Sequence, residues 1–475
     1  MPAHANKYWF DFTQSANVRW GRDAGAVETE VADHSALYYV DDRKIAGRFG
    51  HMLAPLLADW VDIALAFYVA DRLALRRDSS DRARSLQWGR ILDLKIPVRE
   101  LVTWRRPGVV ESLVRALRYF TEDDWRIDFV PRVGAGRISE SQGFLFPSAP
   151  PAPARVALYS GGLDSFIGAI QQMAEFPSDS LVFVSGVTNT RQRSGQRKQL
   201  AAISHAFGRQ IWHVAVPYGF RWARSGRRHP EESSQRTRGF LFLTLGVATA
   251  LATQAQELYV YENGVGAINL PYDGTQIGTS NSRAIHPLAL RRMEDFVSCL
   301  TEHRFPIKNP FLFCTKAEMC RHPAVRNLQE CIPLTFSCDG FPVRARNRSQ
   351  CGSCTSCLLR RMSLESAGLS QFDRTGYLNE LPGTRGLTRK RQRDALQTMA
   401  WQAHRINVAL GKANPWEELV REFVELQDLA EGICRATGEN PIELQGKLMR
   451  LYGQYASEWA GFSATQTPVG LGQTA

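Results

Sequence analysis

Cysteine is missing before Cys299, and uninterrupted apolar runs of membrane length are missing from the whole 475-residue chain. A disulfide framework would spread cysteines through the domain that it cross-links, so we expect none. The most apolar stretches are 53–75, which three aspartates interrupt, and 240–253, which is too short for a bilayer core of about 30 Å. Residues 1–17 also lack the basic start and apolar core of a secretory signal. The sequence therefore predicts a cytoplasmic protein without a membrane partner.

Acidic residues are fewer than basic ones, because 47 Asp and Glu stand against 58 Lys and Arg, for a net charge of +11. The hydrophobic content of 44% is ordinary for a globular protein and excludes a disordered or fibrous chain. A basic surplus of this size is compatible with nucleic acid, an anionic small molecule or an acidic protein as partner. The position of the charge must decide between them.

A segment rich in proline and alanine divides the chain. Residues 146–154 predict a linker, which leaves 1–145 as an N-terminal α+β region, a scaffold or partner-docking domain. Over 155–370, short apolar runs alternate with helical patterns, which predicts an α/β domain with a parallel sheet covered on both faces. The expected strands cover 155–159, 181–187, 211–216 and 257–261. Ligands bind such sheets at the carboxyl ends of the strands.

The remainder of the chain is predicted to be helical over 371–462. Pro415 is expected to open one helix that runs towards Cys434, and Pro441 another that runs towards Tyr455. Residues 463–475 are small and polar, and predict a flexible tail.

The turn after the first strand of the α/β domain carries the string SGGLDS, from Ser160 to Ser165. Two glycines allow a tight turn and the close approach of an anion, and the following helix offers N–H donors to a phosphate. The serines add hydroxyl donors, and Asp164 suits a phosphate-bound Mg²⁺. A plain strand-to-helix turn is the alternative. The string is not the Walker A loop of ordinary phosphoryl-transferring NTPases.

SGGLDS at this position resembles the PP-loop ATP pyrophosphatase superfamily. The resemblance implies cleavage of ATP to AMP and pyrophosphate, usually to adenylate a substrate carbonyl or carboxylate that a nucleophile then attacks. The loop would hold the leaving pyrophosphate, and cations would stabilise the charge that develops on it.

The basic surplus is concentrated beside this loop. Residues 189–238 hold eleven Arg and Lys against Glu231 and Glu232. This placement favours ATP, its pyrophosphate product and an acidic or carboxylated substrate over nucleic acid as partners. For Arg224, Arg227 and Arg228, which are expected on a loop, a solvated surface is the alternative.

Four later cysteines form a C-x12-C-x2-C-x2-C pattern: Cys338, Cys351, Cys354 and Cys357. The close triplet, with a glycine after its first member, lets successive thiolates turn back onto one ion. Four thiolates in a cytosolic protein predict a closed, tetrahedral and therefore structural Zn²⁺ site. An Fe–S cluster and unmetallated buried cysteines are the alternatives.

An SGGLDS turn combined with a late CGxCxxC cluster resembles the 7-cyano-7-deazaguanine synthase (QueC) family over 155–368. That family activates the carboxyl of 7-carboxy-7-deazaguanine with ATP and converts it to a nitrile. The resemblance implies that five loop residues bind pyrophosphate and Mg²⁺: Ser160, Gly161, Gly162, Asp164 and Ser165.

The same resemblance assigns nucleotide contacts to Gln196, Arg197 and Arg238, and it places Lys316 against the activated centre. A solvated helix face is the alternative for Gln196 and Arg197. The expected catalytic residues are therefore Ser160, Asp164, Arg238 and Lys316.

The chain departs from the QueC family at the substrate pocket. Where the family has a Tyr-Pro-Asp-Cys-Arg stretch, this sequence reads Tyr261-Glu262-Asn263-Gly264. Glu262, Asn263 and Gly264 are therefore the candidate substrate residues. The changed pocket and the two added regions resemble the longer QueC-like proteins of bacterial antiphage systems (Qat type and type IV CBASS). That resemblance implies transfer of a deazaguanine, through its activated carboxyl, to the N-terminal amine of a partner protein from a defence operon.

The sequence thus predicts an ATP-dependent ligase that uses Mg²⁺, carries structural Zn²⁺ and modifies or conjugates a deazaguanine-type nucleobase. The enzymatic alternatives are a 7-cyano-7-deazaguanine synthase and a tRNA-modifying PP-loop enzyme, for which the net charge offers some support. The non-enzymatic alternative is a nucleotide-binding structural subunit of a defence complex.

Overall fold

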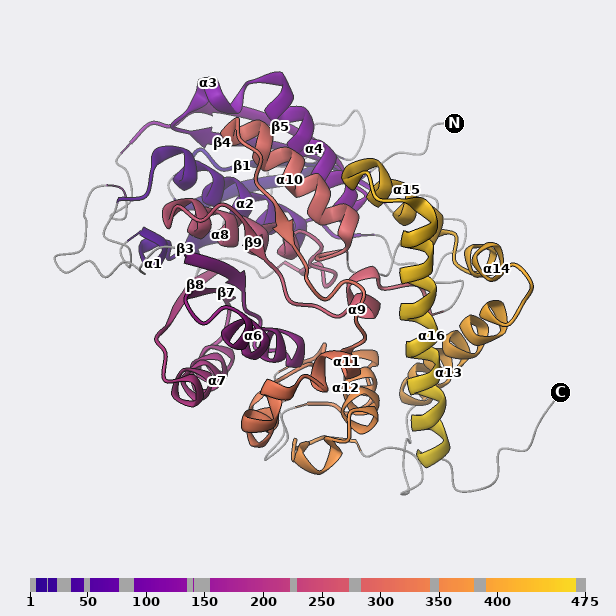
Figure 1. The fold of residues 1–475 in the computed structure, drawn as a ribbon. Helices are drawn as coiled ribbons and strands as arrows, with labels where there is room; N and C mark the ends of the chain where they lie inside the picture. The colour runs from indigo at the N-terminus through magenta and orange to yellow at the C-terminus, as the bar shows by residue number, and fades with distance from the viewer. Residues whose placement is uncertain are drawn as a thin grey trace.

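A mostly parallel sheet of ten strands runs through the molecule (Figure 1). The computed structural model describes residues 6–14, 16–23, 36–46, 52–76, 89–134, 140, 154–222, 229–272, 283–341, 350–379 and 390–466. The strands are β1 (Asn6–Asp11), β2 (Asn17–Asp23), β3 (Ala36–Val40), β4 (Arg90–Val98), β5 (Asp124–Pro131), β6 (Ala154–Leu158), β7 (Ser180–Val187), β8 (Ile211–Trp222), β9 (Leu258–Tyr259) and β10 (Ile307–Lys308). Their order across the sheet is β10-β9-β6-β7-β8-β3-β2-β1-β4-β5.

Helices connect these strands and make up the C-terminal part of the chain. Those before the last strand are α1 (Arg43–Ala46), α2 (Pro55–Leu73), α3 (Leu101–Trp104), α4 (Pro107–Thr121), α6 (Leu163–Glu175), α7 (Thr190–Phe207), α8 (Arg238–Ala252), α9 (Gly264–Ile268) and α10 (Pro287–Thr301). Those after it are α11 (Lys316–Cys320), η2 (Pro323–Leu334), α12 (Thr355–Ser366), η3 (Ser370–Phe372), α13 (Lys390–Leu410), α14 (Pro415–Glu422), α15 (Glu425–Thr437) and α16 (Pro441–Gln466). No described helix is long and apolar enough to cross a membrane.

Strands β6 to β10 form the parallel part that the alternating pattern predicts. β6 pairs with β7 on one side and β9 on the other, and β7 pairs with β8, all in parallel. Because successive side chains of a strand point to opposite faces, Val182 joins the core beneath α8, while Phe183 joins the core beneath α6 and α7 (Figure 1). The continuous apolar run of β7 is therefore buried on both faces, as expected for a parallel strand.

The N-terminal region continues the same sheet. Residues 218–222, the second half of β8, pair antiparallel with β3, and β1, β4 and β5 form a further parallel group. The third predicted strand, expected to end at Val216, therefore continues to Trp222 because its extension has a partner from the N-terminal region.

One apolar core also spans these two parts of the chain. Phe67 of α2 lies 5.8 Å from Phe240 of α8, and Trp60 of α2 lies 5.4 Å from Phe296 of α10, measured between ring centroids. Of the predicted linker 146–154, residues 146–153 lie outside the described residues, and Ala154 is already the first residue of β6.

The C-terminal helices form a second core that also contains residues of α9 and α12. The single helix predicted from Pro415 towards Cys434 is wrong. α14 ends and α15 begins around Phe423, which leaves the helical conformation and buries its ring in this core. α16 continues to Gln466, beyond the predicted start of the tail, and residues 467–475 lie outside the described residues.

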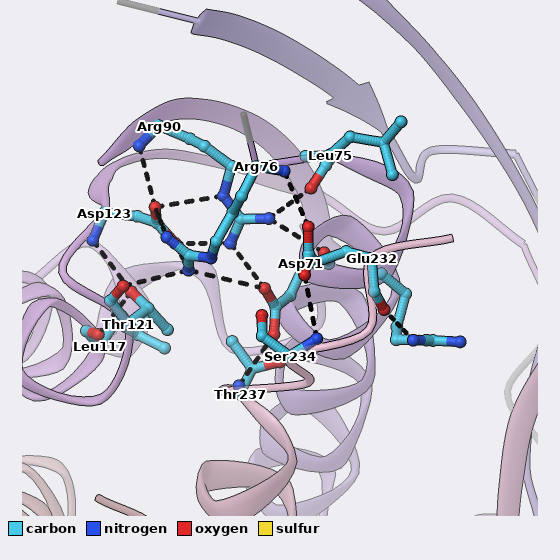
Figure 2. A network of polar contacts seen from close by, with 12 residues as sticks. Asp71, Leu75, Arg76, Arg90, Leu117, Thr121, Asp123, Glu232, Ser234 and Thr237 are labelled. Atoms are coloured by element: carbon cyan, nitrogen blue, oxygen red, sulfur yellow. Dashed lines mark hydrogen bonds and ion pairs between the residues drawn. The ribbon is translucent and has the colours of Figure 1, made fainter. Parts of the chain in front are cut away.

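A buried group of charges connects the N-terminal region to the start of α8 (Figure 2). The Arg90 guanidinium lies 2.6 Å from both the Asp71 and the Asp123 carboxylates, and Arg76 lies 2.7 Å from Asp123. Asp71 also accepts hydrogen bonds from the backbone N–H and the hydroxyl of Thr237, which directly precedes α8. Burial alone would raise the pKa of Asp71, but Arg90 lowers it below its ordinary value. Asp71 is thus held as an anion, and the two aspartates together face two arginines.

Removal of one charge from this group should destabilise the fold. Asp123→Asn leaves Arg76 and Arg90 with too little negative charge in a buried place, so we expect a loss of about 3 kcal/mol or more in the free energy of unfolding, measured with urea. Asp124→Asn is the matched control, because the neighbouring Asp124 pairs with Arg118 on the surface, and it should cost less than about 1 kcal/mol. Equal effects of the two substitutions would contradict the stabilising role of the buried group.

Candidate active site

The SGGLDS segment forms the turn between β6 and α6, and its own serines hold its shape. The Ser165 hydroxyl accepts a hydrogen bond of 3.1 Å from the Gly161 N–H, and the Ser160 hydroxyl accepts one of 3.1 Å from the Gly162 N–H. Gly161 has a φ of 84°, in the left-handed region that glycine adopts without strain. The first glycine is therefore required by the backbone of the turn.

The N-terminus of α6 presents backbone donors at this turn. The Phe166 N–H makes the first hydrogen bond of the helix, to the Gly162 carbonyl at 3.0 Å. The N–H groups of Leu163, Asp164 and Ser165 precede that bond, so they have no partner within the helix. Together with the positive end of the helix dipole, they suit a phosphate group.

Asp164 meets Lys316 in a buried ion pair beside this helix end. The Lys316 ammonium lies 2.7 Å from the Asp164 carboxylate, and both residues are buried. Burial alone would lower the pKa of Lys316, but the Asp164 and Glu262 carboxyls raise it above its ordinary value. The lysine is therefore a fixed positive charge next to the candidate phosphate site.

Asn263 and Glu262 complete the group from the segment that follows β9. The Asn263 side-chain amide donates to the Asp164 carboxylate at 3.0 Å and to the Glu262 carboxyl at 2.7 Å. Burial raises the pKa of Glu262 to about 8, and the Asp164 charge adds to the rise. Glu262 is thus largely protonated at neutral pH, and it can exchange a proton under physiological conditions.

Gly264 has a packing role beside this group. Its N–H donates to the Cys314 carbonyl at 2.8 Å, and a Cβ atom at this position would lie 2.0 Å from the Leu312 carbonyl oxygen. Of the three predicted substrate residues, Glu262 and Asn263 therefore present side chains to Asp164, whereas Gly264 allows two backbone segments to approach each other.

The C-terminal region holds Lys316 in place. Thr315 and Glu318 form a capping box at the start of α11, and the Thr315 hydroxyl donates to Glu458 of α16 at 2.9 Å. Arg450 of α16 pairs with Glu318 at 2.6 Å. The capping box is readable as Thr-x-x-Glu, whereas the contribution of Glu458 has no local signal in the sequence.

Two glutamines of α7 fasten the SGGLDS turn from the other side. Gln196 is buried and donates to the Ser160 carbonyl at 3.0 Å, and its side-chain oxygen is buried without a partner among the described residues. Gln199, which sequence reasoning missed, donates to the Gly161 carbonyl at 3.1 Å and accepts from the Tyr159 hydroxyl at 2.6 Å. Arg197 is exposed and lies on a different side of α7.

Arg238 is the first residue of α8 and is exposed. Its guanidinium lies 5.8 Å from the centroid of the Phe242 ring. Among the described residues, no hydrogen bond or ion pair joins Arg238 to the SGGLDS turn or to Lys316. The structure thus brings together Ser160, Asp164 and Lys316 of the four expected catalytic residues, and it places Arg238 apart from them.

The four predicted metal-binding cysteines do come together. Their sulfur atoms lie within 4.8 Å of one another, so Cys338, Cys351, Cys354 and Cys357 could bind a structural metal such as zinc. The Cys351 sulfur accepts hydrogen bonds from the backbone N–H groups of Ser353 and Cys354, and the Cys338 sulfur accepts one from that of Cys351. Such N–H donors stabilise thiolates.

Phe336 links the cysteine group to the SGGLDS turn, although no sequence signal marks it. Its N–H donates to the Gly161 carbonyl at 3.1 Å, and its ring occupies the side of Gly161 to which a side chain would point. The Gln350 side chain holds the residues on either side of Phe336, because it accepts a hydrogen bond from the Ser337 N–H and donates one to the Thr335 carbonyl. The segment that leads into Cys338 therefore forms one wall of the turn.

Comparison with family models and with curated proteins found no match. The PP-loop and QueC resemblances stay predictions from sequence, and the functional interpretation depends on them together with the geometry around Asp164.

Glu262 should make stability depend on pH. The unfolded chain releases this proton near the ordinary pKa of 4.5, whereas the folded protein keeps it up to about 8. Between these values the unfolded state binds fewer protons, so the folded protein loses stability as the pH rises. Glu262→Gln should remove this loss. From about pH 5 to about pH 8, its free energy of unfolding should gain more than about 1 kcal/mol relative to the unsubstituted protein.

The exposed Glu330 provides the control, and Glu330→Gln should follow the unsubstituted protein at every pH. If the free energy of unfolding of Glu262→Gln, measured with urea, changed with pH by the same amount as that of the unsubstituted protein, the raised pKa of Glu262 would be contradicted.

Loss of one cysteine should abolish metal binding. Cys357 is fully buried in the four-cysteine group, so Cys357→Ser should lower the metal content from about one ion per chain to almost none. Elemental analysis of the purified protein measures both amount and identity, and iron together with acid-labile sulfide in place of zinc would identify an Fe–S cluster. Cys299→Ser, outside the group, should leave the metal content unchanged. A metal content that Cys357→Ser does not alter would contradict the assignment.

Proposed function

We propose that the chain is an ATP-dependent enzyme that releases AMP and pyrophosphate and adenylates the carboxyl of a 7-deazaguanine-type nucleobase. It then transfers the activated base to a nitrogen nucleophile, the N-terminal amine of a partner protein in bacterial antiviral defence. The observation that carries the proposal is that the buried Asp164–Lys316 pair and the partly buried Glu262 lie together at the α6 N-terminus. The choice of base and acceptor follows the sequence resemblance.

ATP phosphates fit the donors at the SGGLDS turn. The N–H groups of Leu163, Asp164 and Ser165 and the exposed Ser160 side chain all lie at the start of α6. Because Phe336 covers the opposite side of Gly161, an anion approaches the turn from the helix end. Asp164 supplies the carboxylate oxygen that Mg²⁺ prefers, and that ion would neutralise phosphate charge.

Lys316 serves as the fixed cation of this centre. Negative charge builds on the pyrophosphate as it leaves and later on the departing AMP. A preorganised ammonium in a buried place stabilises such charge more effectively than water does. Asp164 and the capping box of α11 hold the lysine in that position.

Glu262 is the candidate proton acceptor. When a neutral amine attacks the acyl adenylate, a C–N bond forms, the C–O bond to AMP breaks and the nitrogen must lose a proton. The ionised form of Glu262 takes that proton, and a pKa of about 8 allows the carboxyl to release it again near neutral pH. Asn263 fixes the orientation of the Glu262 carboxyl relative to Asp164.

The proposal predicts formation of AMP and pyrophosphate with 7-carboxy-7-deazaguanine and the proteins encoded next to this chain. Lys316→Met removes the fixed cation and Asp164→Asn removes its counter-charge, so each should lower AMP formation by about 100-fold or more. Intact-mass analysis should show one deazaguanine acyl group on the N-terminus of a partner. The surface variants Lys412→Met and Asp339→Asn are matched controls and should keep full activity.

Three results would overturn the proposal. Absence of AMP with every combination of base and partner would exclude the adenylating activity. A free nitrile without any protein adduct would identify a 7-cyano-7-deazaguanine synthase instead. Full activity of Asp164→Asn in cells would favour a structural subunit that does not turn over ATP.

A further inference from the structure

A basic groove runs between α7 and β8, on a different side of α7 from the SGGLDS turn. It has a volume of about 820 Å³. Leu200, Ala201 and Ile211 provide its apolar lining. Its polar lining consists of Thr190, Arg193, Ser194, Arg197, Lys198, Ser204 and His213.

The charge of the groove is positive and unbalanced. α7 contains four Arg and Lys, namely Arg191, Arg193, Arg197 and Lys198, of which the last three line the groove, and neither α7 nor β8 contains an Asp or a Glu. None of these four side chains makes an ion pair with any residue in the part of the chain that the structure describes. Arg90 and Arg76, in contrast, are paired with buried aspartates. The groove thus offers cations that an external anion can neutralise.

The lining of the groove is longer than one phosphate group. From Thr190 to Ser204 the helix rises by about 21 Å, at about 1.5 Å per residue, and the three lining cations lie within Arg193 to Lys198, a rise of about 7.5 Å. Arg193 and Arg197 are one helical turn apart, and hydroxyl groups lie at both ends and in the middle of the row. Arginine, lysine, serine and threonine are among the side chains that contact nucleic-acid phosphates.

The groove is separate from the candidate active site at the SGGLDS turn. Gln196 and Gln199 point from α7 to the Ser160 and Gly161 carbonyls. Arg193 and Lys198 line the groove, and among the described residues neither makes a hydrogen bond or ion pair with that turn. A ligand in the groove would therefore lie beside the candidate active site without replacing ATP.

We propose that this groove binds the sugar–phosphate backbone of single-stranded nucleic acid. The proposal goes beyond the enzymatic function and does not depend on it. Apart from His213, the described residues that line the groove offer no ring on which bases could stack, so binding should depend on phosphates and not on base sequence. An oligouridylate and an oligothymidylate of equal length should therefore bind equally well.

The test uses fluorescence anisotropy of a labelled oligouridylate with the full chain at several KCl concentrations. If about three cations are neutralised, the logarithm of the association constant should fall with that of the salt concentration with a slope of about −2. The double variant Arg193→Glu, Lys198→Glu should weaken binding by about tenfold or more and flatten this slope. A second variant, Arg193→Gln, Lys198→Gln, removes the charge without reversing it and should have an intermediate effect.

The control reverses two exposed cations elsewhere, as Arg326→Glu, Lys412→Glu, and should change neither affinity nor slope. Equal binding by the groove variant and this control would overturn the proposal. Displacement of the oligouridylate by polyglutamate at equal charge would identify an acidic-protein surface instead, and displacement by pyrophosphate alone would assign the groove to the nucleotide site. AMP formation should stay unchanged in the groove variants, so failure of this proposal and failure of the enzymatic one are distinguishable.

Discussion

The ion pair between Asp164 and Lys316 is the interaction around which the candidate centre is built. Burying two charges is costly, and such a pair persists only when its geometry is good and its remaining polar atoms are satisfied. Asn263 satisfies the second oxygen of Asp164 and connects it to Glu262. The raised pKa of Glu262 follows from the same burial and the same negative neighbour. One buried contact therefore explains a fixed ammonium, a fixed carboxylate and an acid that titrates near physiological pH.

The added regions of the chain contact the α/β part from two directions. From the N-terminal side, β3 extends the sheet at β8, and Asp71 holds Thr237 at the start of α8. From the C-terminal side, Glu458 holds the cap of α11, whose first residue is Lys316. The four-cysteine group acts through Phe336, which lies against Gly161. A chain longer than its α/β part thus uses its extra length to fix the position of a few polar groups.

Local patterns predicted those features that depend on neighbouring residues. The apolar runs predicted the parallel strands, SGGLDS predicted the turn before α6, and the cysteine spacing predicted the group that could hold a metal. Features that depend on distant residues were missed: the pairing of β3 with β8, the support of the turn by Gln199, and the wall formed by Phe336. A nucleotide contact of Gln196 stays a prediction, and its side chain also donates to the turn, a role that only the packing of α7 reveals.

The most direct measurement is a crystal structure of the chain with Mg²⁺ and an ATP analogue that cannot be cleaved between its α- and β-phosphates. We expect the phosphates at the N–H groups of Leu163 to Ser165, with Asp164 and Lys316 on either side of their charge. Phosphates bound elsewhere, for example along α7 at Arg193, with the Asp164–Lys316 pair untouched, would contradict the assignment of this buried pair as the centre of the reaction.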